Sequence, residues 1–261
     1  MLKKPTIKPP MITIAGSTGS GKTSLAALFP NVAMIMAEDG KAAFSEWDEA
    51  LQPLVFSRIR RASETYSPKG KILEYINWLA TAEHDRQTLV IDTITEMHAL
   101  FEQEMCLKYN VATAGDGAGG YQKGYEELAL WHKEILYACE VLRARTGMTV
   151  VFLAHEAIEK IKIDPEGPSD YAVFNIDLHK KSRTPYVALS DVVAFINQEA
   201  IVVGQEVDKR GKTTKFGRLK LTGIRRLISS SDGRTGYLSA KNRYNMEPII
   251  AFDLGENPFL E

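Results

Sequence analysis

The sequence predicts an α/β fold, in which a mostly parallel sheet is flanked by helices and extended by antiparallel strands toward the carboxyl end. Three observations lead to this fold class. Short apolar runs alternate with helical patterns over residues 1–155, as in parallel sheets covered on both faces. Residues 16–23 read GSTGSGKT between an apolar run and a helical pattern. After His155, hairpin-like alternation replaces the strand–helix order.

The part of the chain up to His155 alternates strands and helices in a regular order. Short apolar runs indicate buried strands, and longer stretches with apolar residues at helical spacing indicate helices. The expected strands are 11–15, 31–37, 54–59, 88–92 and 148–154, and the expected helices are 23–29, 72–82, 95–109 and 125–145. Segment 112–124 contains five glycines and is predicted to form a mobile loop.

The segment GSTGSGKT matches G-x-x-x-x-G-K-[ST], the phosphate-binding loop of P-loop NTPases. A strand is expected before it and a helix after it, which is the context that the pattern requires. Backbone N–H groups of such a loop surround phosphate oxygens at the positive end of the helix dipole, and Lys22 is expected to reach the β- and γ-phosphates of ATP. The expected nucleotide-binding residues are Gly16, Ser17, Thr18, Gly19, Ser20, Gly21, Lys22, Thr23 and Ser24.

Asp92 ends the apolar strand 88–92, which is the position of a Walker B aspartate. Such a carboxylate holds Mg²⁺, and the Thr23 hydroxyl is expected to bind the same ion. The alternative is that Asp92 caps the helix that follows it. With a phosphate loop upstream, we expect Thr23 and Asp92 to form a Mg²⁺ site.

The general base for attack by water is expected elsewhere, because Thr93 follows Asp92 where many P-loop ATPases place a glutamate. Glu38 directly follows a predicted strand, at the sheet edge where the γ-phosphate would lie, and is the preferred catalytic base. Glu96 is the alternative base, and Glu38 could also belong to a simple polar turn. His155 ends another strand and is predicted to sense the γ-phosphate, although a lone histidine is more often a packing residue.

The remainder of the chain is predicted to add antiparallel strands to the same sheet. Strands are expected over 191–197, 201–207 and 215–221, and the turn-forming residues 208–212 between the last two indicate a hairpin. We see no linker that would separate two domains. The expected organisation is one domain with an amino-terminal tail (1–10), a nucleotide-binding core (11–155), a β-rich extension (156–250) and an acidic tail (251–261).

Composition limits the other classes of function. The 32 basic and 33 acidic residues give no overall attraction to nucleic acid or to a membrane. No apolar stretch approaches the about 20 residues needed to span a bilayer, and the amino terminus lacks the apolar core of a signal peptide. Cys106 and Cys139 lack metal-binding spacing. We therefore expect a cytoplasmic protein with no membrane partner and no structural metal.

Five segments occur in an order similar to that of the RecA/RadA/DnaB-type recombinases and helicases, namely IAGSTGSGKTSLAALFP, MIMAEDG, TLVIDTITE, VVFLAHEAIEK and SAKNRYN. Over about residues 11–250 the chain resembles the compact phage ATPases of that group, the Sak-type RecA-like single-strand annealing proteins. The resemblance implies a RecA-like core with Glu38 as the catalytic glutamate. It also implies that Lys241 and Arg243 act in trans on a neighbour's phosphates, within a homo-oligomeric ring or filament.

Two basic clusters are candidate DNA contacts. Residues 209–226 hold eight basic and no acidic residues, and the 24 basic and 33 acidic residues elsewhere leave a net charge of −9. The second cluster follows His155, where RecA-like proteins place DNA-contacting loops, and Tyr171, Phe174 and Tyr186 nearby could stack on bases. Either cluster alone is equally compatible with a solvated surface. With the resemblance, single-stranded DNA is the preferred partner, and the expected contacts are Lys180, Lys181, Arg183, Lys209, Arg210 and Lys212.

Three functions are compatible with these features. The preferred one is an ATP- and Mg²⁺-dependent single-stranded DNA-binding ATPase of phage origin, which promotes annealing or recombination in the host cytoplasm. Its hydrolysis would be stimulated by DNA, and a single-strand-binding protein would be a further partner. The alternatives are a helicase-like or loader motor that acts on nucleic acid, and a P-loop small-molecule kinase, for which no compact substrate-binding insert is visible.

Overall fold

The computed structural model describes residues 8–161, 171–204, 206–207, 213–230, 236–237 and 239–260. Its α-helices are α1 (Lys22–Ala27), α2 (Pro68–Thr81), α3 (Ile94–Tyr109), α4 (Lys123–Thr146) and α5 (Lys180–Leu189). Its 3₁₀ helices are η1 (Lys41–Phe44), η2 (Glu49–Leu51) and η3 (Ala114–Gly119). Within the described ranges, no helix is both long enough and apolar enough to cross a membrane.

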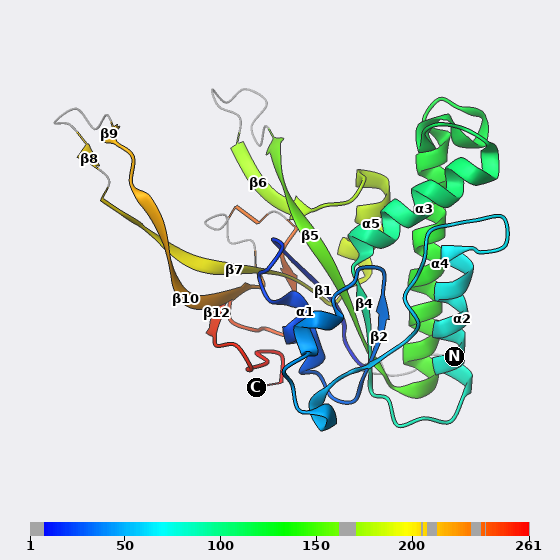
Figure 1. Ribbon diagram of the computed structural model, residues 1–261, viewed down its shortest axis with the longest axis horizontal. Helices are drawn as coiled ribbons and strands as arrows, with labels where there is room; N and C mark the ends of the chain where they lie inside the picture. Colours follow the sequence, from blue (N-terminus) through cyan, green and yellow to red (C-terminus); the bar gives the residue numbers. More distant parts are fainter. Residues whose placement is uncertain are drawn as a thin grey trace, which may run out of the picture.

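The strands form one large sheet with β1 near its middle (Figure 1), and a separate small pair, β8 with β9. The strands are β1 (Met11–Gly16), β2 (Val32–Met36), β3 (Leu54–Val55), β4 (Thr88–Asp92), β5 (Thr149–Ile161), β6 (Tyr171–Ile176), β7 (Val192–Val203), β8 (Glu206–Val207), β9 (Thr213–Lys215), β10 (Arg218–Ile228), β11 (Lys241–Asn242) and β12 (Ile249–Phe252). The order in the large sheet is β12-β10-β7-β1-β5-β4-β2-β3, with β6 paired to β5 and β11 paired to β7.

The strands from β7 to β3 in this order pair in parallel, whereas β6, β10, β11 and β12 are antiparallel to the strands with which they pair. The predicted fold class is therefore confirmed. One strand, β5, lies between the phosphate-loop strand β1 and the Asp92 strand β4. The carboxyl ends of these parallel strands meet at one edge of the sheet, which is where the polar residues predicted for the nucleotide site belong.

Side chains of the parallel strands alternate between two apolar layers. Met11 and Ala15 belong to the layer that contains side chains of α2, α3, α4 and α5. Ile12 and Ile14 belong to the layer that contains α1, η1 and the carboxyl-terminal segment around Phe252. All six residues of β1 are buried. Because both faces of the sheet are covered, its strands read in the sequence as nearly continuous apolar runs.

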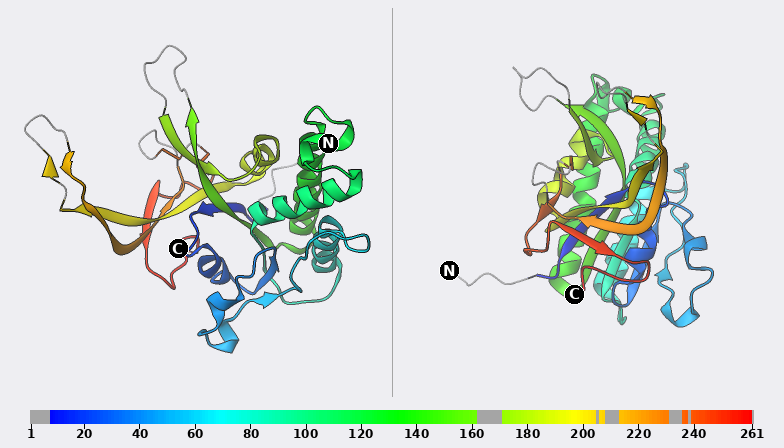
Figure 2. Two further views of the ribbon diagram at one scale, coloured as in Figure 1. Left: turned by 45° about the horizontal axis from the view of Figure 1, so that its top comes forward. Right: turned by 90° about the vertical axis from the view of Figure 1, so that its left-hand side faces the viewer.

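β5 changes its pairing at His155. Up to this residue it pairs in parallel with β1, and from Glu156 onward it pairs antiparallel with β6. The two strands leave the body as a ribbon (Figure 2), and β7 and β10 form a second ribbon on another side of the molecule. We call residues 199–203 and 218–224 of this second ribbon the arm. The antiparallel part is therefore built largely from continuations of core strands.

The glycine-rich segment 112–124, predicted as a mobile loop, is packed instead. It contains η3, and Ala114, Gly115 and Gly117 are buried. A Cβ on Gly124 would lie 1.7 Å from the carbonyl oxygen of Ala114. The glycines here allow a close approach of backbone segments between α3 and α4.

Helix α5 is absent from the sequence-based prediction, which placed DNA-contacting loops in this part of the chain. The helix begins after His179, whose ring nitrogen accepts a hydrogen bond from the N–H of Lys181 (3.4 Å). It contains Pro185, which removes a backbone donor and weakens the helical pattern in the sequence. Burial of Tyr186 in the layer with α4 compensates for this cost.

Candidate nucleotide site

Residues 16–23 connect β1 to α1 as a tight loop. Gly19 and Gly21 have φ angles of 78° and 96°, in the left-handed region that glycine adopts without strain. At the start of the loop, a Cβ on Gly16 would lie 2.6 Å from the carbonyl oxygen of Ile196 in β7. Glycine is therefore needed both for the turn and for contact with the neighbouring strand.

Lys22 begins α1, and its side chain folds back over the loop. Its Nζ donates hydrogen bonds to the carbonyl oxygens of Gly16 (2.8 Å) and Ser17 (2.9 Å). Burial lowers the pKa of the Lys22 ammonium, and the charges of Asp92 and Glu38 oppose that shift. A largely desolvated ammonium beside the backbone N–H groups of the loop is suited to neutralising phosphate oxygens.

Thr23 and Asp92 come together from α1 and the end of β4. Thr23 Oγ1 donates a hydrogen bond to Asp92 Oδ2 (2.8 Å). Asp92 is 2% exposed, and burial raises its pKa to about 6. A carboxylate and a hydroxyl oxygen are hard ligands that suit Mg²⁺, and a poorly solvated carboxylate gains from a nearby cation. The two residues therefore fit a Mg²⁺ site.

Glu38 follows β2 and forms a second pair of contacts. Its Oε1 accepts a hydrogen bond from Thr93 Oγ1 (2.6 Å) and lies 2.7 Å from His155 Nε2. The hydrogen bond from His155 is the main cause that lowers the pKa of Glu38. Because an ionised carboxylate only accepts hydrogen bonds, Nε2 of His155 carries the proton. Thr93 occupies the position after Asp92 where many P-loop ATPases have a glutamate. Here it helps to hold Glu38 instead.

A cavity of about 350 Å³ lies over the loop and gathers these groups. Among the residues that line it are Thr18, Gly19, Gly21, Lys22, Thr23, Ser24, Glu38, Asp92, Thr93, His155 and Arg225. Gly16, Ser17 and Ser20 do not line the cavity, although the first two hold Lys22. Glu96, the alternative base, does not line it either, and its N–H donates to Thr93 Oγ1 (3.2 Å) at the start of α3.

Two residues of this region were missed by sequence reasoning. Glu156 follows His155, and its Oε2 is buried without a hydrogen-bond partner among the described residues. Burial raises the pKa of Glu156, while the nearby Lys22 charge lowers it. Arg225 comes from β10, and its Nε donates to the carbonyl oxygen of Ser20 (3.4 Å). The adjacency of Glu156 to a strand-end histidine was the available signal, whereas Arg225 was hidden in the basic run 209–226.

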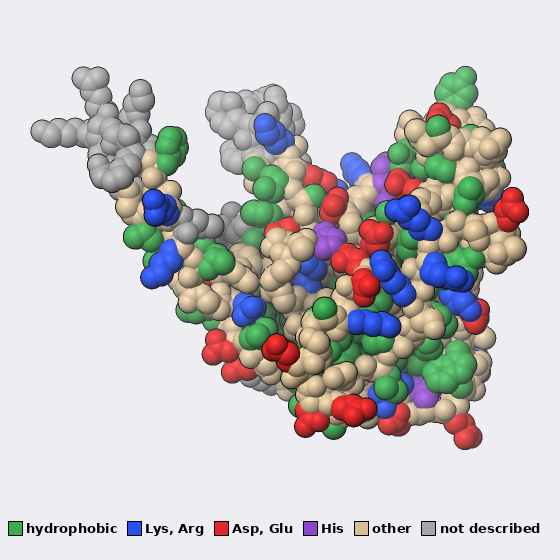
Figure 3. All heavy atoms as spheres, viewed as in Figure 1, with side chains coloured by type: hydrophobic (Ala, Val, Ile, Leu, Met, Phe, Trp, Pro, Cys, Tyr) green, Lys and Arg blue, Asp and Glu red, His purple; other side chains and the backbone are tan. Residues whose placement is uncertain are grey.

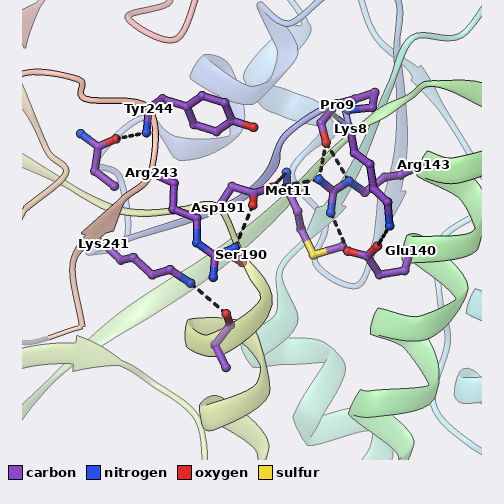
Figure 4. A network of polar contacts seen from close by, with 12 residues as sticks. Lys8, Pro9, Met11, Glu140, Arg143, Ser190, Asp191, Lys241, Arg243 and Tyr244 are labelled. Atoms are coloured by element: carbon purple, nitrogen blue, oxygen red, sulfur yellow. Dashed lines mark hydrogen bonds and ion pairs between the residues drawn. The ribbon is translucent and has the colours of Figure 1, made fainter. Parts of the chain in front are cut away.

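Lys241 and Arg243 belong to a network of polar contacts (Figure 4) next to the starts of β1 and β7. Lys241 Nζ donates to two carbonyl oxygens at the end of α5 (2.9 and 2.8 Å). Arg243 pairs with Asp191 (3.1 Å), which also pairs with Arg143 (2.8 Å) and accepts a hydrogen bond from the N–H of Met11 (3.0 Å). Since Met11 begins β1, these residues lie at the amino ends of the parallel strands. They do not reach the phosphate loop of their own chain, and their role in a neighbour's site stays a prediction.

The basic cluster Lys180, Lys181 and Arg183 lies in the first turn of α5, so its expected placement in a loop was wrong. Lys181 pairs with Glu126 (2.8 Å) on α4. Arg183 is 9% exposed and pairs with Glu159 of β5 (2.5 Å). The guanidinium of Arg183 therefore links α5 to β5, and its charge is already compensated.

The aromatic residues near this cluster are also engaged in packing. Tyr186 is completely buried, and its hydroxyl group lies 2.8 Å from Nδ1 of the buried His132. It therefore cannot stack on a base, contrary to expectation. Phe174 stacks on Tyr237 with ring centroids 4.8 Å apart, so one of its faces is covered. The side chain of Tyr171 lies outside the described part of the structure.

The basic run 209–226 is not one uniform surface. Its predicted DNA contacts Lys209, Arg210 and Lys212 lie outside the described residues. Arg218 and Lys220 are exposed on the arm, where basic and apolar side chains are interspersed (Figure 3). Arg226 pairs with Glu199, and Arg225 lies against the phosphate loop. At least two of the eight cations, Arg225 and Arg226, therefore make contacts within the chain.

Comparison with known proteins identifies a family and shows similarity to solved structures. The family model described as an AAA domain matches residues 8–244. The crystal structure of the RadB recombinase is similar with a TM-score of 0.43 and 15% sequence identity, over 85% of this chain and 80% of that chain. No curated protein matches the sequence.

Proposed function

The chain belongs to the AAA domain family, and from this premise we propose that it binds and hydrolyses ATP with Mg²⁺ over residues 16–23. One observation carries the proposal, namely that four consecutive parallel strands bring their polar residues to one cavity. β1 leads into the loop, Glu38 follows β2, Asp92 ends β4, and His155 is the last residue of β5 that pairs in parallel with β1. Thr23 contacts Asp92 while Glu38 contacts His155. A simple glycine turn or a helix cap would require neither pair.

We assign a task to each group from its contacts. Lys22 and the loop N–H groups bind phosphate oxygens, while Thr23 and Asp92 would hold Mg²⁺, which neutralises phosphate charge when bound. Glu38 is ionised and accepts the proton of the attacking water. Its contacts with Thr93 and His155 both use Oε1, so we assign Oε2 to the water.

The test is ATP binding and hydrolysis by the wild-type protein and Lys22→Ala, with and without Mg²⁺. We expect Lys22→Ala to weaken nucleotide binding by at least about 30-fold, because it removes a charge-assisted contact in a desolvated site. Lys108→Ala, which removes a half-exposed ammonium on α3, is the matched control. Near-wild-type nucleotide affinity in Lys22→Ala would contradict the phosphate-loop assignment.

We also propose that single-stranded DNA is the partner, in annealing or recombination, and that the protein acts as a homo-oligomeric ring or filament. The exposed cations Arg218 and Lys220 on the arm support a local contact with phosphates. In the sequence they belong to the same basic run as Lys209, Arg210 and Lys212, in a chain whose remainder outside 209–226 carries −9. DNA affinity should then depend on few, local contacts and fall steeply with salt.

DNA binding is tested by measuring affinity for a single strand across salt concentrations and the rate of ATP hydrolysis with and without DNA. Replacing Lys209, Arg210 and Lys212 with Ala should weaken binding and lower the log–log salt slope by about 0.7 for each lost phosphate contact. Because Arg183 is structural, the α5 cluster is tested with Lys180→Ala and Lys181→Ala alone. No binding of DNA by the wild type with ATP and Mg²⁺ would reject this partner. ATP-driven unwinding of a duplex would instead support a motor, and phosphate transfer to a small molecule a kinase.

A further inference from the structure

We propose that Arg225 supplies a second cation to the nucleotide phosphates from within the same chain. The inference rests on the proposed nucleotide site, because it assigns a new phosphate contact to that site. Arg225 lines the same cavity as Lys22 and Glu38. Its Nε donates to the carbonyl oxygen of Ser20 at 3.4 Å, across 205 positions of sequence. No other strand of the antiparallel extension brings a cation to this cavity among the described residues.

A bulge in β10 places Arg225 at the height of the loop. β10 pairs regularly with β7 as far as Leu221, which faces Ala200, and the next paired residue, Arg225, faces Gln198. Three residues of β10 therefore oppose one residue of β7. Without the two extra residues, Arg225 would face Ile196, level with the last residue of β1. The bulge moves it by about 7 Å along the strand, beyond the end of β1.

The alternation of β10 then turns Arg225 toward the loop and Arg226 away from it. Leu227 belongs to the apolar layer with α1, and Ile228 belongs to the opposite layer. Since side chains two residues apart share a face, Arg225 lies on the α1 face and Arg226 on the other. Arg226 pairs there with Glu199. Adjacent arginines of one strand thus have different surroundings.

The contact with the loop is close. A Cβ built on Gly21 would lie 3.2 Å from Arg225 Nε, so the guanidinium packs against the loop backbone. No carboxylate of the described residues lies within ion-pair distance of Arg225. A guanidinium is always charged and its planar donors match two phosphate oxygens at once. The anion that suits this position is the polyphosphate of a nucleotide bound over residues 16–23.

The test compares Arg225→Gln with Arg226→Gln, a matched change on the same strand that faces away from the loop. Dissociation constants for ADP and ATP with Mg²⁺ are measured for both variants, for Arg225→Lys, for Lys22→Ala and for the wild type. We expect Arg225→Gln to weaken binding about 10- to 100-fold, the usual worth of a hydrogen bond to a charged group. Arg225→Lys should restore part of the loss, and Arg226→Gln should remain within about twofold of the wild type.

A second readout separates phosphate binding from a structural role. In the wild type, nucleotide should slow hydrogen exchange of the backbone amides of residues 224–226, and Arg225→Gln should lose this protection while keeping its nucleotide-free melting temperature. Equal affinities and equal protection in Arg225→Gln and Arg226→Gln would overturn the inference and leave the proposed site intact. If Lys22→Ala weakens nucleotide binding and Arg225→Gln does not, the inference is likewise wrong and the proposed site still stands. No nucleotide binding by the wild type would overturn the proposed function together with this inference.

Discussion

The two ends of the central strands carry charged clusters that are organised in opposite ways. At the amino ends, Asp191 is paired with Arg143 and Arg243, and Arg143 also pairs with Glu140 (2.6 Å). At the carboxyl ends, burial lowers the pKa of Lys22 and raises the pKa of Asp92. The first cluster compensates its own charges, whereas the second holds desolvated charges of both signs.

The difference indicates what each end can do. A closed cluster of paired charges joins α4 to the starts of β1 and β7 and has little to gain from a ligand. Poorly solvated charges of both signs are stabilised when a cation and a polyanion enter together. Within one chain, stability and ligand binding are thus divided between opposite edges of the sheet. Substitutions at each end should separate these two properties.

The largest expected effect is on hydrolysis at the carboxyl end. Glu38→Gln should keep nucleotide binding and slow hydrolysis by about 10²- to 10⁴-fold, the usual contribution of a general base. Glu96→Gln is the matched control, because Glu96 does not line the cavity. Single-turnover hydrolysis measures both. If Glu96→Gln is slow and Glu38→Gln is not, the base has been assigned wrongly.

The next effect is on stability at the amino end. Asp191→Ala should lower the free energy of unfolding by at least about 3 kcal/mol, because it leaves the buried Arg143 without one of its partners. The melting temperature should fall by about 6–12 °C, while nucleotide affinity of the folded protein stays the same. Arg243→Ala, which removes a cation that is 55% exposed, should cost less than about 1 kcal/mol. A loss of nucleotide affinity in Asp191→Ala would show that the two ends are coupled.

Asp92→Asn should stabilise the nucleotide-free protein above about pH 6, whereas Asp191→Ala should destabilise it. The pKa of Asp92 rises from 3.8 to about 6 in the folded state, so the folded protein binds the proton more tightly than the unfolded chain. The stability gained from this proton is fully present below pH 3.8 and is lost as the pH rises to about 6. Above that pH the ionised carboxylate costs up to about 3 kcal/mol, and Asp92→Asn removes this cost.

The measurement is unfolding of the nucleotide-free protein in denaturant between pH 4 and pH 8. Asp92→Asn should be more stable than the wild type at pH 8 and similar to it near pH 4, while losing Mg²⁺-dependent hydrolysis. Asp253→Asn, which changes an exposed carboxylate, should follow the wild-type curve. A lower stability of Asp92→Asn at pH 8 would mean that the ionised form is favoured by burial partners, contrary to this argument.

The smallest expected effect concerns assembly. If Arg243 completes a neighbour's site, a mixture of inactive Arg243→Ala and inactive Glu38→Gln should recover a fraction of wild-type hydrolysis, because some interfaces combine two intact halves. Co-assembly of the two variants is checked with differently tagged subunits. Absence of recovery in mixed assemblies would leave Arg243 as a partner of Asp191 only.

Much of the parallel core was predictable from the sequence because burial on both faces of the sheet makes its strands apolar along their whole length. Asp92 and His155 could be placed at the loop because parallel strands bring their carboxyl ends to the same edge. Thr23 could be predicted as a site residue from the loop motif itself. The contact of Glu38 with His155 reaches across β4, which lies between β2 and β5, so the sequence could place both residues at one edge without showing that they touch.

The antiparallel extension was less predictable, because its geometry depends on register rather than on apolar pattern. Arg225 and Arg226 are equivalent in the sequence, and only the bulge at 222–224 and strand alternation give them different surroundings. Arg183 appeared as part of a surface cluster, since nothing local indicates that Glu159 lies across from it. Pro185 weakens the helical pattern of residues 180–189, so α5 was not predicted from the sequence. The helix forms because tertiary burial overrides this weak local preference.

The close contact between Gly16 and the carbonyl oxygen of Ile196 has a mechanical consequence. β7 is buried over its first five residues and exposed over its last four, and beyond Ile196 it pairs with β10 and no longer with β1. The seven residues beyond Ile196 extend for about 23 Å at about 3.3 Å per residue. A tilt of about 10° at the glycine contact would therefore displace the far end of the strand by about 4 Å. A small rotation of β7 at the first glycine of the phosphate loop would thus become a movement of several ångströms at the outer end of the strand.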